Sequence, residues 1–592
     1  MISAFVACAG SGAVQRGQEP GQELEDKLRA RLRLLCTAPD QESRLIRVGS
    51  SLVGVLQHPL PALGRDWASR VYCGDAQATV LVGRTAPNVE PDRLPATATH
   101  SLDRLVGAFI LVHAESGPDR LTIIRDHLGD RSAYYRNVDG VWWLSSHEQA
   151  LMEPAEPVNS RRLAQFFAID YPAADSTFFA DIGEVPPGHS LTVGPDPVPR
   201  VTPYYRLPRR TSRLNVPASE AAEELQRLLR LAVRQSCDGT SPAVAVSGGM
   251  DSTSVAACIS GPAQLLTYRT PGYPGCDESN LAKAVATTLG HPLTLVDCGA
   301  CGPLSEDFLA QAPLVQDPGA DAYRAFRRQL AEAGKAGGHR LLLTGDFGDQ
   351  LFGGFRYWLR DLLYSRRWHR GMLEATRLWR SSGVMLPWRQ PELRRLLPLA
   401  GFTRGWKPVP RPWLTERAAD LLPPQSRHHP YLGELAQADR VEPCLNAFNA
   451  RAASLGYLQA LDWGVELRYP LRHRQLVEFM LRLPAHYLYQ PGRSKWILRL
   501  AMADQLPAQI LDRRDKTSLE PIFRDAVLHR HRQTTRELLR ESETWSRFVR
   551  RQWLLQRLDS GQWDPTSLNV LWNCLTFALW NANYGKSVVS LN

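Results

Sequence analysis

Residues 244–254 read Val-Ala-Val-Ser-Gly-Gly-Met-Asp-Ser-Thr-Ser. A short apolar run ends at Val246, a glycine pair lets the backbone turn tightly, and a helical pattern follows from Thr253. The free N–H groups and the dipole at the start of such a helix favour anions. Because Asp251 would repel a bare phosphate, its presence implies a bridging Mg²⁺. The stretch therefore predicts a phosphate-binding loop after a buried strand, with an ordinary Gly-Gly turn as the alternative.

Strands and helices are predicted to alternate around this loop. Helical periodicity covers 218–236, 278–289 and 322–333, and short apolar runs lie at 243–246, 265–268 and 341–344. Such alternation is typical of a parallel α/β sheet. From residue 355 onward the chain reads as mostly helical.

The first part of the chain has a different pattern. Short apolar runs broken by Gly, Pro and Asp lie at 51–55, 79–82, 105–112 and 121–124. They predict a sheet-rich domain, which ends at a polar, Pro- and Arg-rich stretch near 204–217. We therefore predict an α/β protein with two domains, 1–205 and 218–592.

Composition limits the class of protein. The 592 residues are 44% hydrophobic and 22% charged, which is ordinary for a soluble globular chain. No run approaches the ~20 apolar residues of a membrane-spanning helix, and the start lacks the basic residues of a secretory signal. Ten scattered cysteines, of which only Cys298 and Cys301 lie close together, favour reduced thiols over a structural metal site. We expect a cytoplasmic protein that does not bind membranes.

The net charge of +10 is concentrated in one segment. Between residues 356 and 411 basic side chains far outnumber acidic ones and alternate with tryptophans: Trp358, Trp368, Trp379, Trp388 and Trp406. This pattern suits nucleic acid, an acidic peptide, or a solvated helix face with a buried Trp side.

The phosphate-binding loop resembles a known motif. Ser-Gly-Gly-Met-Asp-Ser at 247–252 is similar to the PP-loop of ATP pyrophosphatases, which make adenylates. It lacks the Gly-Lys-Ser/Thr ending of a Walker loop, so transfer of the γ-phosphate is not expected. The resemblance implies that ATP is bound by Ser247, Gly248, Gly249, Asp251, Ser252 and Gly345.

Three later segments resemble asparagine synthetase-like enzymes. They are Leu-Leu-Thr-Gly-Asp-Phe-Gly-Asp-Gln-Leu-Phe-Gly-Gly at 342–354, Glu-Leu-Arg-Tyr-Pro-Leu with Leu-Val-Glu-Phe at 466–479, and Gly-Arg-Ser-Lys-Trp-Ile-Leu-Arg with Leu-Pro and Arg-Asp-Lys at 492–516. All these motifs occur in the same order along the chain as in that family. A chance resemblance does not explain this.

The resemblance assigns a role to each charged residue. Asp251 and Asp349 would together hold Mg²⁺ against the ATP phosphates, although Asp349 could instead cap a helix. Lys495 and Lys516 are similar to the two family lysines that neutralise pyrophosphate and the charge developing on it. Asp346 stands where the family has Glu or, in β-lactam-forming members, Tyr. It would orient or deprotonate the incoming amine, with a loop hydrogen bond as the alternative.

The position of Lys516 needs a small adjustment. Counting from the Leu-Pro pair at 506–507 places this lysine one position later than in typical asparagine synthetases. Counting from Arg514 places it in register. We therefore expect a one-residue insertion before Lys516.

The first domain resembles the glutaminase-type, Ntn-hydrolase-like domain of asparagine synthetases. The resemblance is carried by the segments 107–110, 125–135 and 177–189. A working glutaminase of this type needs a cysteine directly after the initiator methionine, whose α-amine then serves as the base. Ile2 and Ser3 follow Met1 here, and Cys8 lies too far into the chain. We expect a vestigial domain.

A family member without its own ammonia supply takes the amine from the substrate itself. Two branches do so: β-lactam and carbapenam synthetases, and lasso-peptide cyclases. The chain length, the basic Trp-rich segment and the Arg-Asp-Lys ending resemble the cyclases more closely. This resemblance implies that ATP activates an Asp or Glu side chain of a leader-cleaved core peptide, whose N-terminal amine then closes a macrolactam.

The same resemblance implies a leader peptidase and a leader-recognition protein as partners, and no nucleic acid. Three alternatives stay open. They are a β-lactam or carbapenam-type synthetase, an ammonia-dependent asparagine synthetase and, in a different class, a PP-loop enzyme that modifies nucleic acid.

Overall fold

The structure of the chain is a computed structural model. The residues that it describes are 2–10, 21–36, 41–57, 71–74, 76–85, 102, 105–117, 119–153, 156–170, 176–194, 196, 198–207, 214–237, 239–311, 317–353, 369, 371–373, 375–376, 380, 410–423, 440–441, 444, 447–490, 493–541 and 543–588. The basic Trp-rich segment 356–411 lies almost wholly outside them, so its expected role in binding stays a prediction.

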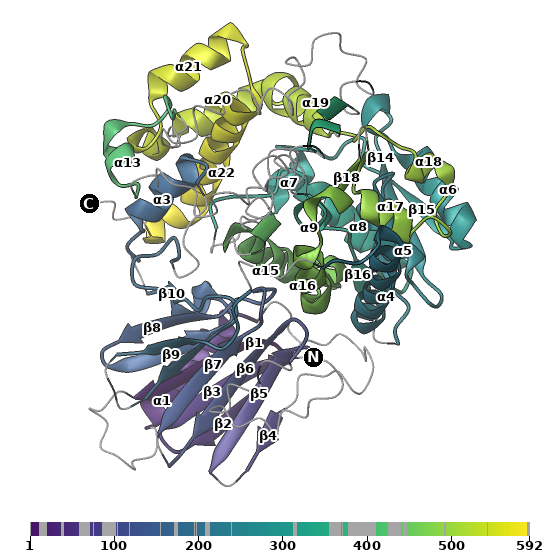
Figure 1. Cartoon of the computed structure of the whole chain (residues 1–592). Helices are drawn as coiled ribbons and strands as arrows, with labels where there is room; N and C mark the ends of the chain where they lie inside the picture. Colours follow the sequence, from purple (N-terminus) through teal and green to yellow (C-terminus); the bar gives the residue numbers. More distant parts are fainter. Residues whose placement is uncertain are drawn as a thin grey trace.

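The N-terminal domain is a sandwich of two antiparallel six-stranded sheets, drawn in purple and blue in Figure 1. The first sheet has the order β10-β8-β9-β1-β3-β2, with β1 Ile2–Gly10, β2 Glu42–Val48, β3 Ser51–Gln57, β8 Tyr134–Val138, β9 Val141–Ser145 and β10 Gly183–Glu184. The second has the order β12-β11-β7-β6-β5-β4, with β4 Val71–Cys73, β5 Gln77–Gly83, β6 Phe109–Glu115, β7 Arg120–Arg125, β11 His189–Val193 and β12 Arg200–Pro203.

Alternating apolar residues of both sheets form the core between them. Phe5 and Val53 of the first sheet pack in one cluster with Val80, Ile110 and Ile123 of the second. Period-two patterning with one face buried produces this arrangement. The predicted β-rich sandwich is therefore confirmed.

One predicted strand begins later than expected. The apolar run 105–112 is extended only from Phe109, because Gly107 has a φ of 136° and lies against the carbonyl of Arg84. A backbone in that region favours glycine and interrupts a strand. Helix α1 (Gln22–Arg33) then covers the outer face of the first sheet with Leu28 and Leu32.

The second domain contains a five-stranded parallel sheet of order β15-β14-β13-β16-β17. Its strands are β13 Ala243–Ala245, β14 Gln264–Arg269, β15 Leu293–Asp297, β16 Leu341–Leu343 and β17 Glu466–Arg468. The helices among them include α4 Ala218–Cys237, α5 Met250–Ala257, α6 Ser279–Leu289, α7 Glu306–Ala310 and α8 Arg324–Ala336. The predicted parallel α/β domain is confirmed. Helix α5 starts at Met250, earlier than the predicted Thr253, because Gly249 ends the turn in an extended conformation.

Helices dominate the remainder of the described chain, as expected. They are α3 Ser160–Phe167 of the first domain, α9 Gly348–Leu351, α13 Glu416–Asp420, α15 Ala447–Asp462, α16 Arg474–Arg482, α17 Trp496–Ala501, α18 Ala508–Leu511, α19 Glu520–Arg524, α20 Arg532–Glu541, α21 Arg551–Ser560 and α22 Pro565–Val588, with the short strands β18 Tyr489–Gln490 and β19 Arg493–Ser494. Helix α22 packs beside α3 (Figure 1), where Phe577 meets Phe167 at 5.3 Å between ring centroids. Within the described residues, no helix is long and apolar enough to cross a membrane.

The polar stretch at which the two domains separate begins with two buried tyrosines. Tyr204 and Tyr205 are each less than a tenth exposed. The hydroxyl of Tyr204 donates to the carbonyl of Arg125 at 2.7 Å. Aromatic rings with a polar tip bury in this way when the tip finds an acceptor. Tyr204 therefore fastens the end of the first domain to its sheet.

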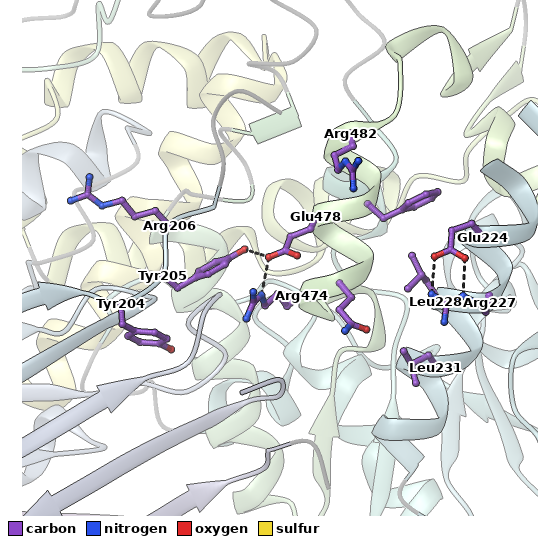
Figure 2. A pocket seen from close by; sticks show the side chains of 12 residues that line it. Tyr204, Tyr205, Arg206, Glu224, Arg227, Leu228, Leu231, Arg474, Glu478 and Arg482 are labelled. Atoms are coloured by element: carbon purple, nitrogen blue, oxygen red, sulfur yellow. Dashed lines mark hydrogen bonds and ion pairs between the residues drawn. The ribbon is translucent and has the colours of Figure 1, made fainter. Parts of the chain in front are cut away.

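An open groove of about 800 Å³ runs along this seam between residues 204–206, helix α4 and helix α16 (Figure 2). The Tyr205 hydroxyl donates to Glu478 at 2.8 Å, and Glu478 also accepts from Arg474 at 2.8 Å. None of the residues lining the groove is a predicted site residue. The groove thus belongs to the domain seam.

His127 at this seam gives a pH prediction. Its ring is 5% exposed, and burial, followed by the charge of Arg474, lowers its pKa to about 3. The unfolded chain takes up this proton near pH 6.5, so the contribution of His127 is complete above that pH and is lost as the pH falls toward 3. The loss amounts to about 1.4 kcal/mol per pH unit.

We expect His127→Gln, whose amide oxygen can still accept from Arg474, to flatten the stability profile on the acid side. Urea unfolding at pH 7.5 and pH 5 checks it. The gap in unfolding free energy between wild type and variant should shrink by about 2 kcal/mol at pH 5. A gap that does not depend on pH would contradict the burial argument.

Candidate functional site

The phosphate-binding loop follows strand β13 and is closed by its own side chains. The backbone N–H of Ser247 donates to the Ser252 hydroxyl at 3.0 Å, and that of Gly249 donates to the Ser247 hydroxyl at 3.0 Å. The two hydroxyl oxygens lie 3.0 Å apart. Gly249, the residue before α5, provides no side-chain cap. The start of this helix therefore offers backbone donors to an anion.

Gly345 lets strand β16 approach the loop closely. A Cβ at this position would collide with the backbone of Ser252. Gly348 has the same property toward the side chain of Asp251. Only glycine fits where two backbones meet so closely. The two segments that resemble the family motifs are thus brought into direct contact.

Two aspartates and two lysines converge beside the loop. The ammonium nitrogen of Lys495 contacts Asp251 Oδ2 and lies 2.8 Å from Asp349 Oδ1. Lys516 contacts the other oxygen of Asp349. These residues are separated by up to 265 positions in the sequence, yet they form one chain of contacts. All four are predicted site residues.

Burial and charge set the protonation of this cluster. Burial raises the pKa of Asp251, in spite of Lys495. Burial alone would also raise the pKa of Asp349, but Lys495 and Lys516 outweigh it and lower that pKa to about 2. Burial would lower the pKa of Lys495, but Asp251 and Asp349 outweigh it and raise it. Asp349 is therefore kept ionised next to its cations, whereas burial disfavours the charged form of Asp251.

The aspartate pair suits a hard divalent cation. Asp251 Oδ1 is buried and has no hydrogen-bond partner, and an unsatisfied carboxylate oxygen in such a place is costly unless a cation fills the need. Mg²⁺ is typically held by one or two carboxylates together with substrate phosphates. Within the described part of the chain, no group of three or more His, Cys, Asp or Glu side chains forms an all-protein metal site. The residues thus fit a cation shared with a nucleotide.

Two non-glycine residues at this site have a left-handed backbone. Lys495 has a φ of 57° and Phe347 has a φ of 77°. Each precedes a helix, α17 and α9, that carries or positions the cluster. Such backbone strain, about 1–3 kcal/mol per residue, persists where the surrounding structure enforces it and is concentrated at functional sites.

Asp346 lies at the same edge of the sheet but outside the cluster. Arg327 of α8 holds its carboxylate at 2.8 Å and also binds Asp321 at 2.6 Å. Asp346 is 41% exposed, so one of its oxygens is accessible from solvent. An aspartate held in this way can orient an amine, whereas proton removal would have to compete with Arg327.

Sequence reasoning missed several residues of the site. Arg327 fixes Asp346, and Glu278 and Arg513 lie directly on the phosphate-binding loop. Glu278 looked like an acid at the start of a helix, and Arg513 like one arginine among many. Counting from the Leu-Pro pair at 506–507 aligns the arginine of the family's Arg-x-Lys tail with Arg513 instead of Arg514. Arg513 is partly buried, whereas Arg514 is exposed.

The thiol nearest the start of the chain is not exposed. Cys8 lies in β1 between β3 and β9 and is fully buried. Burial raises the pKa of Cys8 to about 12, so the residue stays a neutral thiol. A glutaminase nucleophile must be a reactive thiolate. Cys8 therefore does not serve as one.

Comparisons with known proteins identify the families that the two parts of the chain match. Residues 224–582 match the asparagine synthase family, and residues 95–205 match the glutamine amidotransferase domain. Amidase chyE of Penicillium rubens is 28% identical over 288 residues, 44% of this chain and 42% of that protein. The match thus spans less than half of that relative.

Two other relatives are covered more fully. Carboxyethyl-arginine beta-lactam-synthase of Streptomyces clavuligerus is 24% identical over 461 residues, 75% of this chain and 71% of that protein. Asparagine synthetase [glutamine-hydrolyzing] 1 of Bacillus subtilis is 21% identical over 496 residues, 77% of this chain and 74% of that protein. The predicted boundaries 1–205 and 218–592 remain predictions. The chain belongs to the asparagine synthase family, and a glutamine amidotransferase domain precedes its synthase domain.

Proposed function

We propose that this chain is an ATP-dependent ligase that activates a carboxylate as an acyl-adenylate and then forms an amide. The observation that carries the proposal is the meeting of Asp251, Asp349, Lys495 and Lys516 at the phosphate-binding loop. The substrate carboxylate oxygen attacks the α-phosphorus of ATP. The bond to the β-phosphate oxygen breaks, and pyrophosphate leaves with its electron pair.

The side chains divide this work. Lys495 and Lys516 neutralise the charge that grows on the departing pyrophosphate, and such stabilisation acts in the transition state. Asp251 and Asp349 would hold Mg²⁺, which when bound would draw charge from the phosphate oxygens. The loop hydroxyls and the open start of α5 position the phosphates.

The amine then attacks the activated carbonyl, and AMP leaves. Asp346, fixed by Arg327, orients this amine from the edge of the sheet. The nucleophile is an amine of the substrate itself. The buried, neutral thiol of Cys8 supports this, because it cannot release ammonia from glutamine. The N-terminal domain then acts as a scaffold.

The substrate of this reaction is a leader-cleaved core peptide. Its Asp or Glu side chain is adenylated, and its N-terminal amine closes a macrolactam, as in a lasso-peptide cyclase. Ring closure over about eight residues costs a few kcal/mol of loop entropy, so the peptide must be bound in a folded form. Amine and carbonyl must lie roughly 3–3.5 Å apart before reaction. Supporting features are the buried thiol and the basic composition of residues 356–411.

Partners and location follow from this substrate. A leader peptidase and a leader-recognition protein would supply the peptide, and ATP is available in the cytoplasm. Co-purification of the chain with products of adjacent genes tests the partners. A β-lactam or carbapenam-type synthetase is the second candidate, favoured by the relative from Streptomyces clavuligerus.

An ATP–pyrophosphate exchange assay separates the candidates. We expect exchange with a core peptide, and none with a carboxyethylated amino acid or with aspartate and ammonia. Exchange with the carboxyethylated amino acid alone would favour a β-lactam-type synthetase. Exchange with aspartate and ammonia would favour an asparagine synthetase. RNA binding that weakens steeply with salt would instead indicate a nucleic-acid-modifying enzyme. Formation of ADP would overturn the adenylation mechanism itself.

The metal assignment makes its own prediction. In Asp349→Asn the Mg²⁺ concentration for half-maximal exchange should rise roughly 10- to 100-fold. Changes in the residues that hold a metal typically weaken its binding by this factor. Asp297→Asn is the matched control, since it removes an exposed carboxylate paired with Arg269. Its Mg²⁺ requirement should equal that of wild type. Equal requirements in all the proteins would exclude Asp349 as a ligand.

A further inference from the structure

A buried ion pair lies directly on the phosphate-binding loop. The backbone N–H of Gly248 donates to Glu278 Oε2 at 3.1 Å, and the other oxygen of Glu278 lies 2.5 Å from Arg513 Nη1. Both side chains are only 10% exposed. A Cβ at Gly248 would collide with Arg513 Nη1, so the guanidinium lies against the loop backbone. A carboxylate thus occupies a donor that a phosphate-binding loop offers to its anion.

The other contacts of Arg513 connect the loop to the segment that carries Lys516. Its Nη2 donates to the Thr517 hydroxyl at 2.6 Å, and its Nε donates to Asp515 at 3.3 Å. Three of the five N–H groups of the guanidinium are therefore engaged, and the remaining donors belong to Nη1 and Nη2. Arg513 can donate a remaining N–H to a phosphate oxygen while keeping its bond to Glu278.

We propose that Arg513 is a third cation of the pyrophosphate site, and that Glu278 is a stand-in for phosphate that the nucleotide displaces from the Gly248 N–H. In the empty site Glu278 satisfies a donor that would otherwise lose its partner. When ATP arrives, two anions cannot share this N–H. The carboxylate moves off and keeps its bond to Nη1, while Arg513 donates a remaining N–H to the phosphate. The inference rests on the proposed adenylation site.

The opposing interpretation is a permanent brace. In that case Glu278 and Arg513 only hold the loop and the 513–517 segment together, and no phosphate ever contacts either. Removing either side chain would then loosen the loop, weaken phosphate binding and lower stability in parallel. A displaced stand-in and a brace therefore predict opposite signs for Glu278.

Calorimetric titration with inorganic pyrophosphate in excess Mg²⁺ measures this sign on the full chain. Glu278→Gln keeps the shape but removes the competing charge, so we expect the Kd for pyrophosphate to fall about three- to tenfold. Arg513→Gln removes a charge-assisted donor, so we expect the Kd to rise roughly 10- to 100-fold. Arg513→Lys keeps the charge without the fork and should lie between wild type and Arg513→Gln.

The neighbouring arginine is a matched control. Arg514 is exposed, and Arg514→Gln makes the same change in net charge, so its Kd should stay within about twofold of wild type. Thermal unfolding of each variant shows whether it folds. A higher Kd in Glu278→Gln would overturn the stand-in role, and an unchanged Kd in Arg513→Gln would overturn the cation role. If wild type does not bind pyrophosphate at all, the adenylation site itself is wrong.

Discussion

Lys495→Met lowers the rate of ATP–pyrophosphate exchange by about 10²- to 10³-fold, with a smaller effect on the KM for ATP. The ammonium of Lys495 lies between Asp251 and Asp349, and it is the only one of the two lysines that contacts both. Its charge is needed most when the bond to pyrophosphate breaks, because negative charge then grows on the leaving group. An interaction that strengthens in the transition state affects kcat more than substrate binding.

A matched pair of variants separates charge from backbone strain. Lys495 has a φ of 57°, which glycine adopts without strain. Lys495→Gly and Lys495→Met both lack the ammonium and should be equally slow, but the glycine variant should unfold at the higher urea concentration. Equal stability of the two would mean that the left-handed backbone costs nothing here.

Lys516→Met provides the comparison within the cluster. Lys516 is 76% exposed and contacts only Asp349, so its side chain moves more freely and its loss should slow exchange less than the loss of Lys495. The order of the two effects is the informative result. A larger effect for Lys516 would mean that the segment 513–517 closes over the nucleotide and that Lys495 only pairs the aspartates.

Local patterns predicted the frame of this site well. A strand, a glycine pair and hydroxyls around residues 244–254 predict a phosphate-binding loop because each step obeys short-range rules of backbone geometry. The alternation of apolar runs and helices predicts a parallel sheet, whose carboxyl edge gathers loops from distant parts of the chain. The meeting of Asp251 and Asp349 was expected from the resemblance to the family, in whose fold the matching residues lie close together.

The side-chain partners at that edge were not predictable in the same way. Arg327 pairs with Asp346, and Arg513 pairs with Glu278 across 235 positions. Arginine is abundant in this chain, so composition gives no reason to select these two. Their roles depend on how α6 and α8 pack against the sheet. The hydrophobic periodicity of the sequence does not predict that packing. Long-range ion pairs are fixed by tertiary structure and leave no local signal.

Arg451→Met destabilises the protein by about 3–5 kcal/mol, the usual cost of leaving buried charges without their partner. Arg451 of α15 lies 3.3 Å from Glu148, 3.5 Å from Glu184 and 2.9 Å from Asp317. It is 3% exposed, and the two glutamates belong to the N-terminal domain. One guanidinium therefore compensates carboxylates on both sides of the domain junction.

The destabilisation by Arg451→Met should depend on pH, and the pKa of Glu148 predicts the direction of that dependence. Burial, opposed by Arg451, raises the pKa of Glu148 to about 8, whereas the unfolded chain titrates near 4.5. The folded protein thus binds the extra proton between these values, and stability falls as the pH rises from 4.5 to 8. Without Arg451 this pKa rises further. The destabilisation by Arg451→Met should therefore be larger at pH 8 than at pH 5.5, and Glu148→Gln in the same chain should recover part of it.

Urea unfolding at the two pH values measures both effects, and Arg227→Met is the control. Arg227 pairs with Glu224 on the exposed face of α4, where an ion pair contributes little. If Arg451→Met were as mild as this control, the ion pairs of Arg451 would contribute little to the stability of the junction. If it is severe, the N-terminal domain has a structural role that does not depend on glutaminase chemistry. Its glutamates help to neutralise an arginine that α15 buries, so deleting the domain would leave Arg451 with Asp317 alone of these three carboxylates.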